Sequence, residues 1–144
     1  LDAHTQKCFE ARTSLLLNGG AEAYVRAQAL FLYPPHWIST HLDPLTEAEN
    51  KQLLDFPPIQ NVLARIQAVQ AFKLEEAHQQ ALKDVLVHLI ANQDDFLVPY
   101  QRSQQLQQLL PHSQLSLFAT GAHASTVTET AQINQSILQF LKSA

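Results

Sequence analysis

The sequence predicts an α/β fold in which four helices are followed by a strand, a helix, a second strand and a last helix. Residues 85–91 (VLVHLIA) form a nearly continuous apolar run, which is typical of a strand covered on both faces of a parallel sheet. Residues 115–119 (LSLFA) predict a second strand, and leucines at helical spacing over residues 101–110 lie between the two. A helix is the usual connection between parallel strands, so we expect the two strands to be neighbours.

The first half of the chain contains only helical patterns, and capping residues, glycines and prolines mark where each helix begins and ends. We expect Asp2 to cap the first helix and residues 19–20 (GG) to end it. A second helix is expected to end at the two adjacent prolines, Pro34 and Pro35. A capping box at residues 46–49 (TEAE) opens a third helix. A fourth helix follows, and it carries three apolar residues at helical spacing: Val62, Ile66 and Val69.

The two helices of the second half also have a predicted apolar face. One covers residues 101–110, and a capping box at residues 126–129 (TVTE) indicates the start of the other. We expect both to pack through apolar side chains: Leu106, Leu109, Leu110, Ile133, Ile137 and Leu141. A parallel sheet of two strands is not a stable unit by itself, so the strand at residues 85–91 is expected to need further neighbours.

Composition narrows the class of function. The chain is 46% hydrophobic and 15% charged, which is typical of a globular protein, and its net charge of −4 comes without any basic stretch. Nucleic acid is not expected as a partner, because its binding needs a cationic face. No apolar run reaches the length of a membrane span and no signal peptide is evident, so we expect a cytoplasmic protein. The histidines lack the spacing of metal ligands, and we expect neither a metal nor a cofactor.

Two residues that carry chemistry follow the predicted strands. Asp95 comes after the first strand and His123 after the second, and catalytic groups of parallel sheets lie at such carboxyl ends. A carboxylate that accepts the Nδ1 proton of an imidazole fixes its tautomer and stabilises the imidazolium. The spacing to Val98 and Pro99 favours Asp95 over Asp94 as the acid. Taken singly, the aspartate also suits a helix cap or turn, and the histidine an ordinary loop position.

The order strand, Asp-x-x-Val-Pro, helix, strand, Gly-x-His, helix resembles the last third of an α/β-hydrolase. In that family the triad order is nucleophile, acid, histidine, and Asp95 and His123 match the last two. The first half adds residues 3–5 (AHT) and 31–37 (FLYPPHW), which are similar to the lid of the aminoacrylate hydrolases of bacterial uracil breakdown. The resemblance covers essentially the whole chain.

This resemblance implies the C-terminal portion of an α/β-hydrolase fold, with residues 1–72 as a helical lid and residues 73–144 as the last β-α-β-α part of the core. It implies a Ser-His-Asp hydrolase of pyrimidine degradation that acts on a small carbonyl, carbamate-like or aminoacrylate-like substrate. In such an enzyme His123 is the general base and Asp95 orients it. Three aromatic residues of the lid are candidates for substrate binding, and they suit packing within the lid equally well: Phe31, Tyr33 and Trp37.

The chain has no nucleophile elbow of its own. Its glycines are Gly19, Gly20 and Gly121, and no two of them have the spacing of Gly-x-Ser-x-Gly. Together with the absence of any methionine, this predicts a fragment that is catalytically inert when isolated. We expect one of two partners: the missing N-terminal half of the hydrolase core, or a second copy of the chain that pairs through exposed strand edges.

Overall fold

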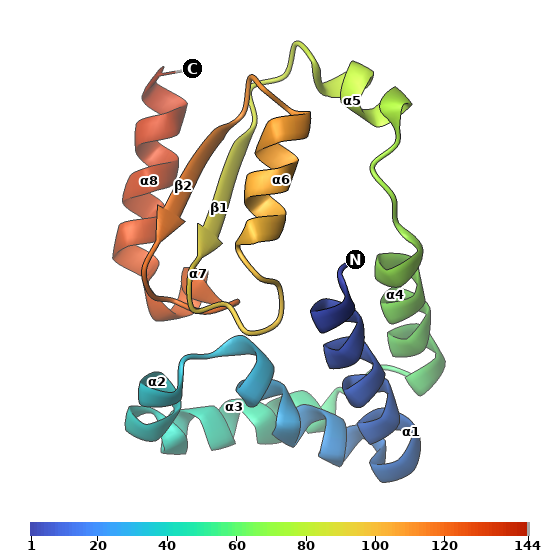
Figure 1. Ribbon diagram of the computed structural model, residues 1–144. Coiled ribbons are helices and arrows are strands. Elements are labelled where there is room, and N and C mark those ends of the chain that lie inside the picture. The colour runs from blue at the N-terminus through green and yellow to red at the C-terminus, as the bar shows by residue number, and fades with distance from the viewer. Residues whose placement is uncertain (144) are drawn as a thin grey trace. The chain divides into compact units, whose positions relative to one another are not determined.

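The computed structural model describes residues 1–143 and divides the chain into two compact units, Leu1–Phe72 and Lys73–Ala144. The first unit consists of helices alone, and the second contains two parallel strands with helices around them (Figure 1). The mixed α/β class and the parallel pair that the sequence predicts are therefore confirmed. None of the helices in residues 1–143 combines the length and the apolar character that a membrane span requires.

Helix α1 (Ala3–Leu32) begins where the sequence predicts it and is interrupted at a glycine. The side chain of Asp2 accepts a hydrogen bond from the backbone N–H of Thr5 at 2.8 Å, so Asp2 is the N-cap. Gly20 has a φ of 70° and a ψ of −164°, a conformation that is almost restricted to glycine. It therefore separates α1 into the two helices that the sequence predicts, and the second of them ends at Leu32.

Three shorter helices complete the first unit: α2 (Pro35–Thr40), α3 (Leu42–Leu54) and α4 (Ile59–Ala71). Helix α2 was not predicted, and it starts at a proline, whose fixed φ suits the first helical position. The prediction that α3 starts at the capping box of residues 46–49 is wrong. The hydroxyl of Thr46 instead donates to the carbonyl of Leu42 at 2.8 Å, a bond that threonine makes inside a helix.

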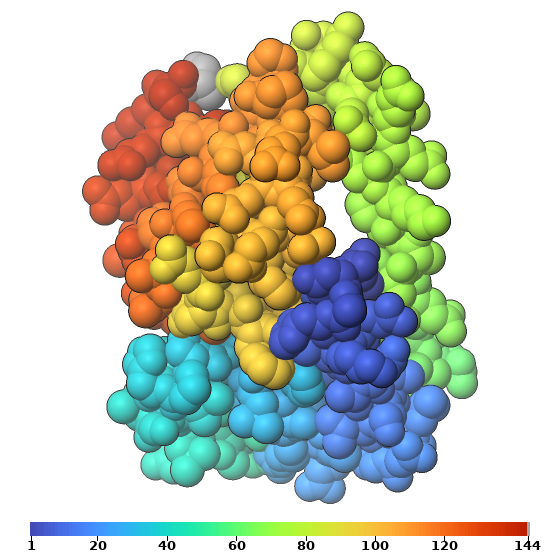
Figure 2. All heavy atoms as spheres, in the orientation of Figure 1, coloured from blue at the N-terminus to red at the C-terminus, as the bar shows by residue number. Residues whose placement is uncertain are grey.

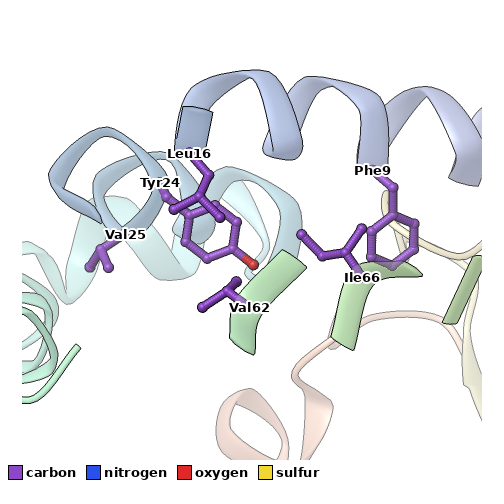
Figure 3. Packing of buried hydrophobic residues seen from close by; sticks show 6 residues of the cluster. All are labelled: Phe9, Leu16, Tyr24, Val25, Val62 and Ile66. Carbon is purple, nitrogen blue, oxygen red and sulfur yellow. The ribbon is translucent and has the colours of Figure 1, made fainter. Parts of the chain in front are cut away.

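The core of the first unit is one apolar cluster between α1 and α4. Its buried members are Phe9, Leu16, Tyr24, Val25, Val62 and Ile66. Figure 3 shows the side chains of Val62 and Ile66 pointing from α4 toward α1. Val69, which was expected on the same buried face, is 46% exposed because it lines an open groove rather than the closed part of the cluster.

The second unit is built on a parallel pair of strands. Its elements are α5 (Glu76–Leu82), β1 (His88–Asn92), α6 (Gln101–Leu109), β2 (Gln114–Phe118), α7 (Ser125–Thr128) and α8 (Thr130–Ser143). The register places Leu89 opposite Leu115 and Asn92 opposite Phe118, so both strands end at the same edge. Figure 1 shows the strands between α6 and α8, and side chains of α6 and β2 hide most of β1 in the space-filling view (Figure 2).

Strand β1 is shorter than the apolar run at residues 85–91 predicts. It starts at His88 because the chain is still turning after α5, where the N–H of Val85 donates to the carbonyl of Leu82 at 3.0 Å. Residues 88–90 are half-buried rather than buried, since β1 pairs only with β2 within residues 1–143. The other edge of this apolar strand is open to a further neighbour.

The helices of the second unit also differ in detail from the prediction. The capping box at residues 126–129 falls on the short helix α7, and α8 starts only at Thr130. Ile133 is buried as expected, but Leu109 and Leu141 are 49% and 62% exposed. A sheet of two strands is too narrow to cover the whole apolar face of both α6 and α8.

Candidate active site

The loops that follow β1 and β2 bring Asp95 and His123 into contact. The two strands are parallel and in register up to Asn92 and Phe118, so the chain leaves both of them at the same edge of the sheet. Beyond this edge the Oδ2 atom of Asp95 lies 2.9 Å from the Nδ1 atom of His123. These are the two residues that strand order, the Asp-x-x-Val-Pro spacing and the family resemblance singled out, although 28 positions separate them in the chain.

The backbone holds the carboxylate of Asp95 on its other side. The Oδ1 atom accepts hydrogen bonds from the N–H groups of Leu97 and Val98, at 2.8 and 2.9 Å. Leu97 is buried, and its packing anchors this turn. Because two N–H groups occupy Oδ1, Oδ2 is the oxygen that remains for the imidazole.

The two partners differ in their exposure to solvent. The side chain of Asp95 is 12% exposed, whereas that of His123 is 38% exposed. The second ring nitrogen of His123, Nε2, makes no hydrogen bond within residues 1–143. A carboxylate at Nδ1 favours the tautomer with the proton on that nitrogen, which leaves Nε2 as a base that can accept a proton.

Asp94, the competing candidate for the acid, contacts the histidine loop rather than the imidazole. Its carboxylate accepts hydrogen bonds from the N–H groups of Ala122 at 2.8 Å and Gly121 at 3.2 Å. Asn92 donates its Nδ2 proton to the carbonyl of Ala122 at 2.7 Å. Sequence reasoning missed both contacts. No local pattern signals them, because Asp94 lies in the turn after β1 and the N–H groups that it binds are 27 and 28 positions away.

The backbone of the histidine loop takes an unusual course just before His123. Gly121 has a φ of 128° and Ala122 a φ of 51°, both in the left-handed region. A Cβ atom at position 121 would lie 2.8 Å from the Cβ of Ser125, so the loop requires glycine there for space as well as for conformation. The hydroxyl of Thr128 donates to the carbonyl of Gly121 at 2.7 Å and further fixes this loop.

The three aromatic candidates for substrate binding lie in the first unit. Tyr33 stacks on Trp37 with ring centroids 4.5 Å apart, and Trp37 stacks in turn on His41 at 4.4 Å. The guanidinium carbon of Arg12 lies 5.8 Å from the ring centroid of Phe31. The structure therefore groups two of the three, and a role in substrate binding stays a prediction for all of them.

A second polar cluster, which the sequence did not suggest, lies between the strands and α8. The Nε2 atom of His88 is 2.9 Å from the hydroxyl oxygen of Ser116, and Ser136 donates to Ser116 at 3.1 Å. The ring of His88 also stacks on Phe140 with centroids 4.7 Å apart. These contacts attach α8 to the sheet. Within residues 1–143 no group of three or more His, Cys, Asp or Glu side chains is arranged to hold a metal ion.

Comparison with known proteins gives a consistent set of relatives, although no family model matches the chain. A protein of Acinetobacter baylyi is 51% identical over 144 residues, which are 100% of this chain and 54% of that protein. A protein of Pseudomonas savastanoi is 44% identical over 138 residues, 96% of this chain and 52% of the relative. One of Agrobacterium fabrum is 42% identical over 140 residues, 97% of this chain and 53% of the relative.

All three relatives carry the name "Putative carbamate hydrolase RutD". The chain spans about half the length of the curated relatives that it matches. The hydrolase resemblance predicted from the sequence is thus confirmed: along its entire length, this chain is similar to proteins named as carbamate hydrolases.

Proposed function

We propose that Asp95 and His123 are the acid and the base of a Ser-His-Asp hydrolase. The observation that carries the proposal is the 2.9 Å contact between Asp95 Oδ2 and His123 Nδ1, with the other carboxylate oxygen already occupied by the backbone. In the reaction, Nε2 of His123 takes the proton of the nucleophile as it attacks the substrate carbonyl, and later gives it to the leaving group. Asp95 holds the ring and stabilises the imidazolium that forms between the two steps.

The nucleophile, we infer, comes from polypeptide outside these 144 residues. No Gly-x-Ser-x-Gly occurs in the chain, and the relatives are about twice as long as the part that matches. Accordingly, Leu1–Phe72 corresponds to a lid and Lys73–Ala144 to the last two strands of an α/β-hydrolase core. The half-buried residues 88–90 of β1 support this proposal, because a strand with one neighbour leaves its apolar side chains incompletely covered.

The substrate class proposed here is a small carbamate or a related carbonyl compound. It rests on the names of the relatives and on the hydrolytic chemistry that a carboxylate and an imidazole support. The stacked rings of Tyr33 and Trp37 offer an apolar surface for the acyl side of such a substrate, with Phe31 as the third candidate. The chain itself supplies the base, its orienting acid and the lid.

A chimera tests this function directly. In it, this chain replaces the 144 matched residues of the Acinetobacter baylyi relative, which restores a protein of full length. We expect hydrolysis of an aryl carbamate or of para-nitrophenyl acetate. His123→Ala, which removes the base, should lower kcat/KM by about 10⁶-fold, and Asp95→Asn, which imposes the wrong tautomer, by about 10⁴-fold.

Asp84→Asn is the matched control for charge, because Asp84 is exposed and lies in the same unit. Its chimera should retain the parent kcat/KM. The proposal is contradicted if the folded chimera hydrolyses neither substrate and is not labelled by a fluorophosphonate probe. It is equally contradicted if the His123→Ala chimera keeps the parent rate, or if this chain alone is labelled.

For the partner, we propose the N-terminal half of the hydrolase core rather than a second copy of the chain. The open edge of β1 is apolar, and a further parallel strand from the absent half would bury it. Light scattering distinguishes the two partners. The chain alone should be monomeric and should form a complex of one to one with the separately produced N-terminal half of the relative, whereas a stable homodimer would contradict this choice.

A further inference from the structure

We propose that Asp94 and Asn92 are positioning residues, which clamp the peptide groups of Gly121 and Ala122 and so hold His123 against Asp95. This inference rests on the proposed role of the Asp95–His123 pair. Neither residue touches the imidazole in the structure. Their side chains act on the backbone immediately before it.

The carboxylate of Asp94 accepts hydrogen bonds from two backbone N–H groups of the histidine loop. One oxygen accepts the N–H of Ala122 at 2.8 Å and the other accepts the N–H of Gly121 at 3.2 Å. Both oxygens are thus engaged, although the residue as a whole is exposed. Hydrogen bonds from N–H groups to a carboxylate are about twice as strong as those between neutral groups. The two adjacent carboxylates therefore have different partners. Asp95 binds the imidazole ring of His123, and Asp94 binds the backbone before it.

The side chain of Asn92 binds a backbone carbonyl of the same loop. It is the last residue of β1, it is 4% exposed, and its Nδ2 donates to the carbonyl of Ala122 at 2.7 Å. Both peptide groups of Ala122 are therefore bound by side chains, one from the end of β1 and one from the loop after it that also carries Asp95. A rigid strand end thus sets the position of a loop that lies about 30 residues further along the chain.

The conformation of the loop explains why such a clamp is needed. Ala122 has a φ of 51°, and a residue with a Cβ keeps a left-handed conformation only when its surroundings hold it there. His123 directly follows this residue, so a relaxation of φ at Ala122 would swing the imidazole away from Asp95. A displacement of a catalytic group by about 1 Å can lower the rate by about 10²-fold.

The tautomer of His123 provides a readout that global stability does not move. Side-chain nitrogen chemical shifts in NMR spectra, recorded at a pH where the imidazole is neutral, distinguish a proton on Nδ1 from one on Nε2. We expect Nδ1–H in the wild-type chain. Asp95→Asn should produce Nε2–H, because its oxygen stays with the N–H groups of Leu97 and Val98 and its amide then faces the ring.

Asp94→Asn removes one of the two acceptors and the charge, while the volume of the side chain is kept. We expect a mixture of the two tautomers, together with amide exchange at Ala122 that is faster by about tenfold or more. Asn92→Ser should have the same effect on the tautomer, and it carries the test if the Asp94 variant does not fold. Asp84→Asn, the exposed control, should leave both readouts unchanged.

The outcomes separate this inference from the proposed function. If wild-type His123 carries its proton on Nε2, the Asp95–His123 pair itself is wrong, and the clamp with it. If the wild type is Nδ1–H and both clamp variants keep that tautomer while only their melting temperature falls, the residues are structural and the positioning role is overturned. Mixed tautomers in the folded variants support it.

Discussion

The two units of this chain are held together by different kinds of interaction. The buried side chains of Leu1–Phe72 are large and apolar, and they come together in one cluster that includes two aromatic rings, Phe9 and Tyr24. In Lys73–Ala144 the buried residues include small or polar ones at the end of β1 and in the loop after β2, such as Ala91, Asn92 and Ala122. Hydrogen bonds from the side chains of Asn92 and Asp94 hold the backbone of Ala122. In the second unit, therefore, the same contacts serve stability and the site, whereas in the first unit stability comes from apolar packing.

The largest effect that this comparison predicts is in the first unit. Leu16 is 0% exposed, and Leu16→Ala should destabilise the unit by about 3–5 kcal/mol, through lost transfer energy and the cavity left behind. Urea denaturation followed by the fluorescence of Trp37 measures this change. Leu17, its neighbour, is 60% exposed, and Leu17→Ala should cost less than about 1 kcal/mol. Equal costs for the two variants would mean that the apolar cluster is not the core.

Each unit contains one glycine with a positive φ, and only one of the two also lacks space for a Cβ atom. Substitution of the two glycines therefore distinguishes the cost of backbone strain from the cost of a steric clash. Both Gly20 and Gly121 have a positive φ, but a Cβ at position 20 meets nothing within 4 Å. A Cβ at position 121 would lie 2.8 Å from Ser125 and 3.1 Å from the Oδ1 of Asn92. Gly20→Ala should therefore cost about 1–3 kcal/mol from strain alone, and Gly121→Ala should cost more because of the added clash.

The second readout for this pair is local. Gly121→Ala should also remove the Nδ1–H signal of His123, since it displaces the loop that carries the imidazole. Gly20→Ala is the matched variant and should leave that signal in place. A Gly121→Ala chain that retains both its stability and the tautomer would show that the histidine loop is not tightly packed.

The smallest effect concerns the surface of the first unit. The Nζ of Lys7 lies 2.6 Å from the Oε2 of Glu10, and this hydrogen bond lowers the pKa of the Glu10 carboxyl. Because the folded pKa lies below the unfolded one, the stabilisation is present above the unfolded pKa and is lost as the pH falls through the folded pKa. Lys7→Gln should raise the pKa of Glu10 toward its ordinary value, as measured by NMR titration of the carboxyl carbon. The exposed site makes any change in stability small, and an unchanged pKa would contradict the contact.

The parts of the fold that the sequence predicts are those with strong local signals. Asp2 caps α1 because its carboxylate reaches an N–H three residues on, and Gly20 interrupts that helix because few other residues adopt its backbone angles. The contact of Asp95 with His123 was predictable because parallel strands place successive loops at one edge. A short stretch of sequence determines the first two features, and the order of strands and helices determines the third.

Other features depend on tertiary contacts that no local pattern shows. The capping box at residues 46–49 lies inside α3, where the Thr46 hydroxyl binds the preceding turn instead. The carboxylate of Asp94 accepts hydrogen bonds from backbone N–H groups 27 and 28 positions further along the chain. From the sequence alone, Asp94 was therefore only a second candidate for the triad acid. Leu141 is exposed because a sheet of two strands is too narrow to cover the whole apolar face of α8. The apolar pattern of the helix alone does not show how wide the sheet is.

The position of the proton on the neutral His123 imidazole distinguishes a catalytic Asp95–His123 pair from an incidental contact. We expect side-chain nitrogen shifts of the wild-type chain to place this proton on Nδ1. Asp95→Asn should move it to Nε2, and Asp94→Asn should yield a mixture. A proton on Nε2 in the wild-type chain, unaffected by Asp95→Asn, would contradict the claim that Asp95 and His123 form the acid and base of a hydrolase.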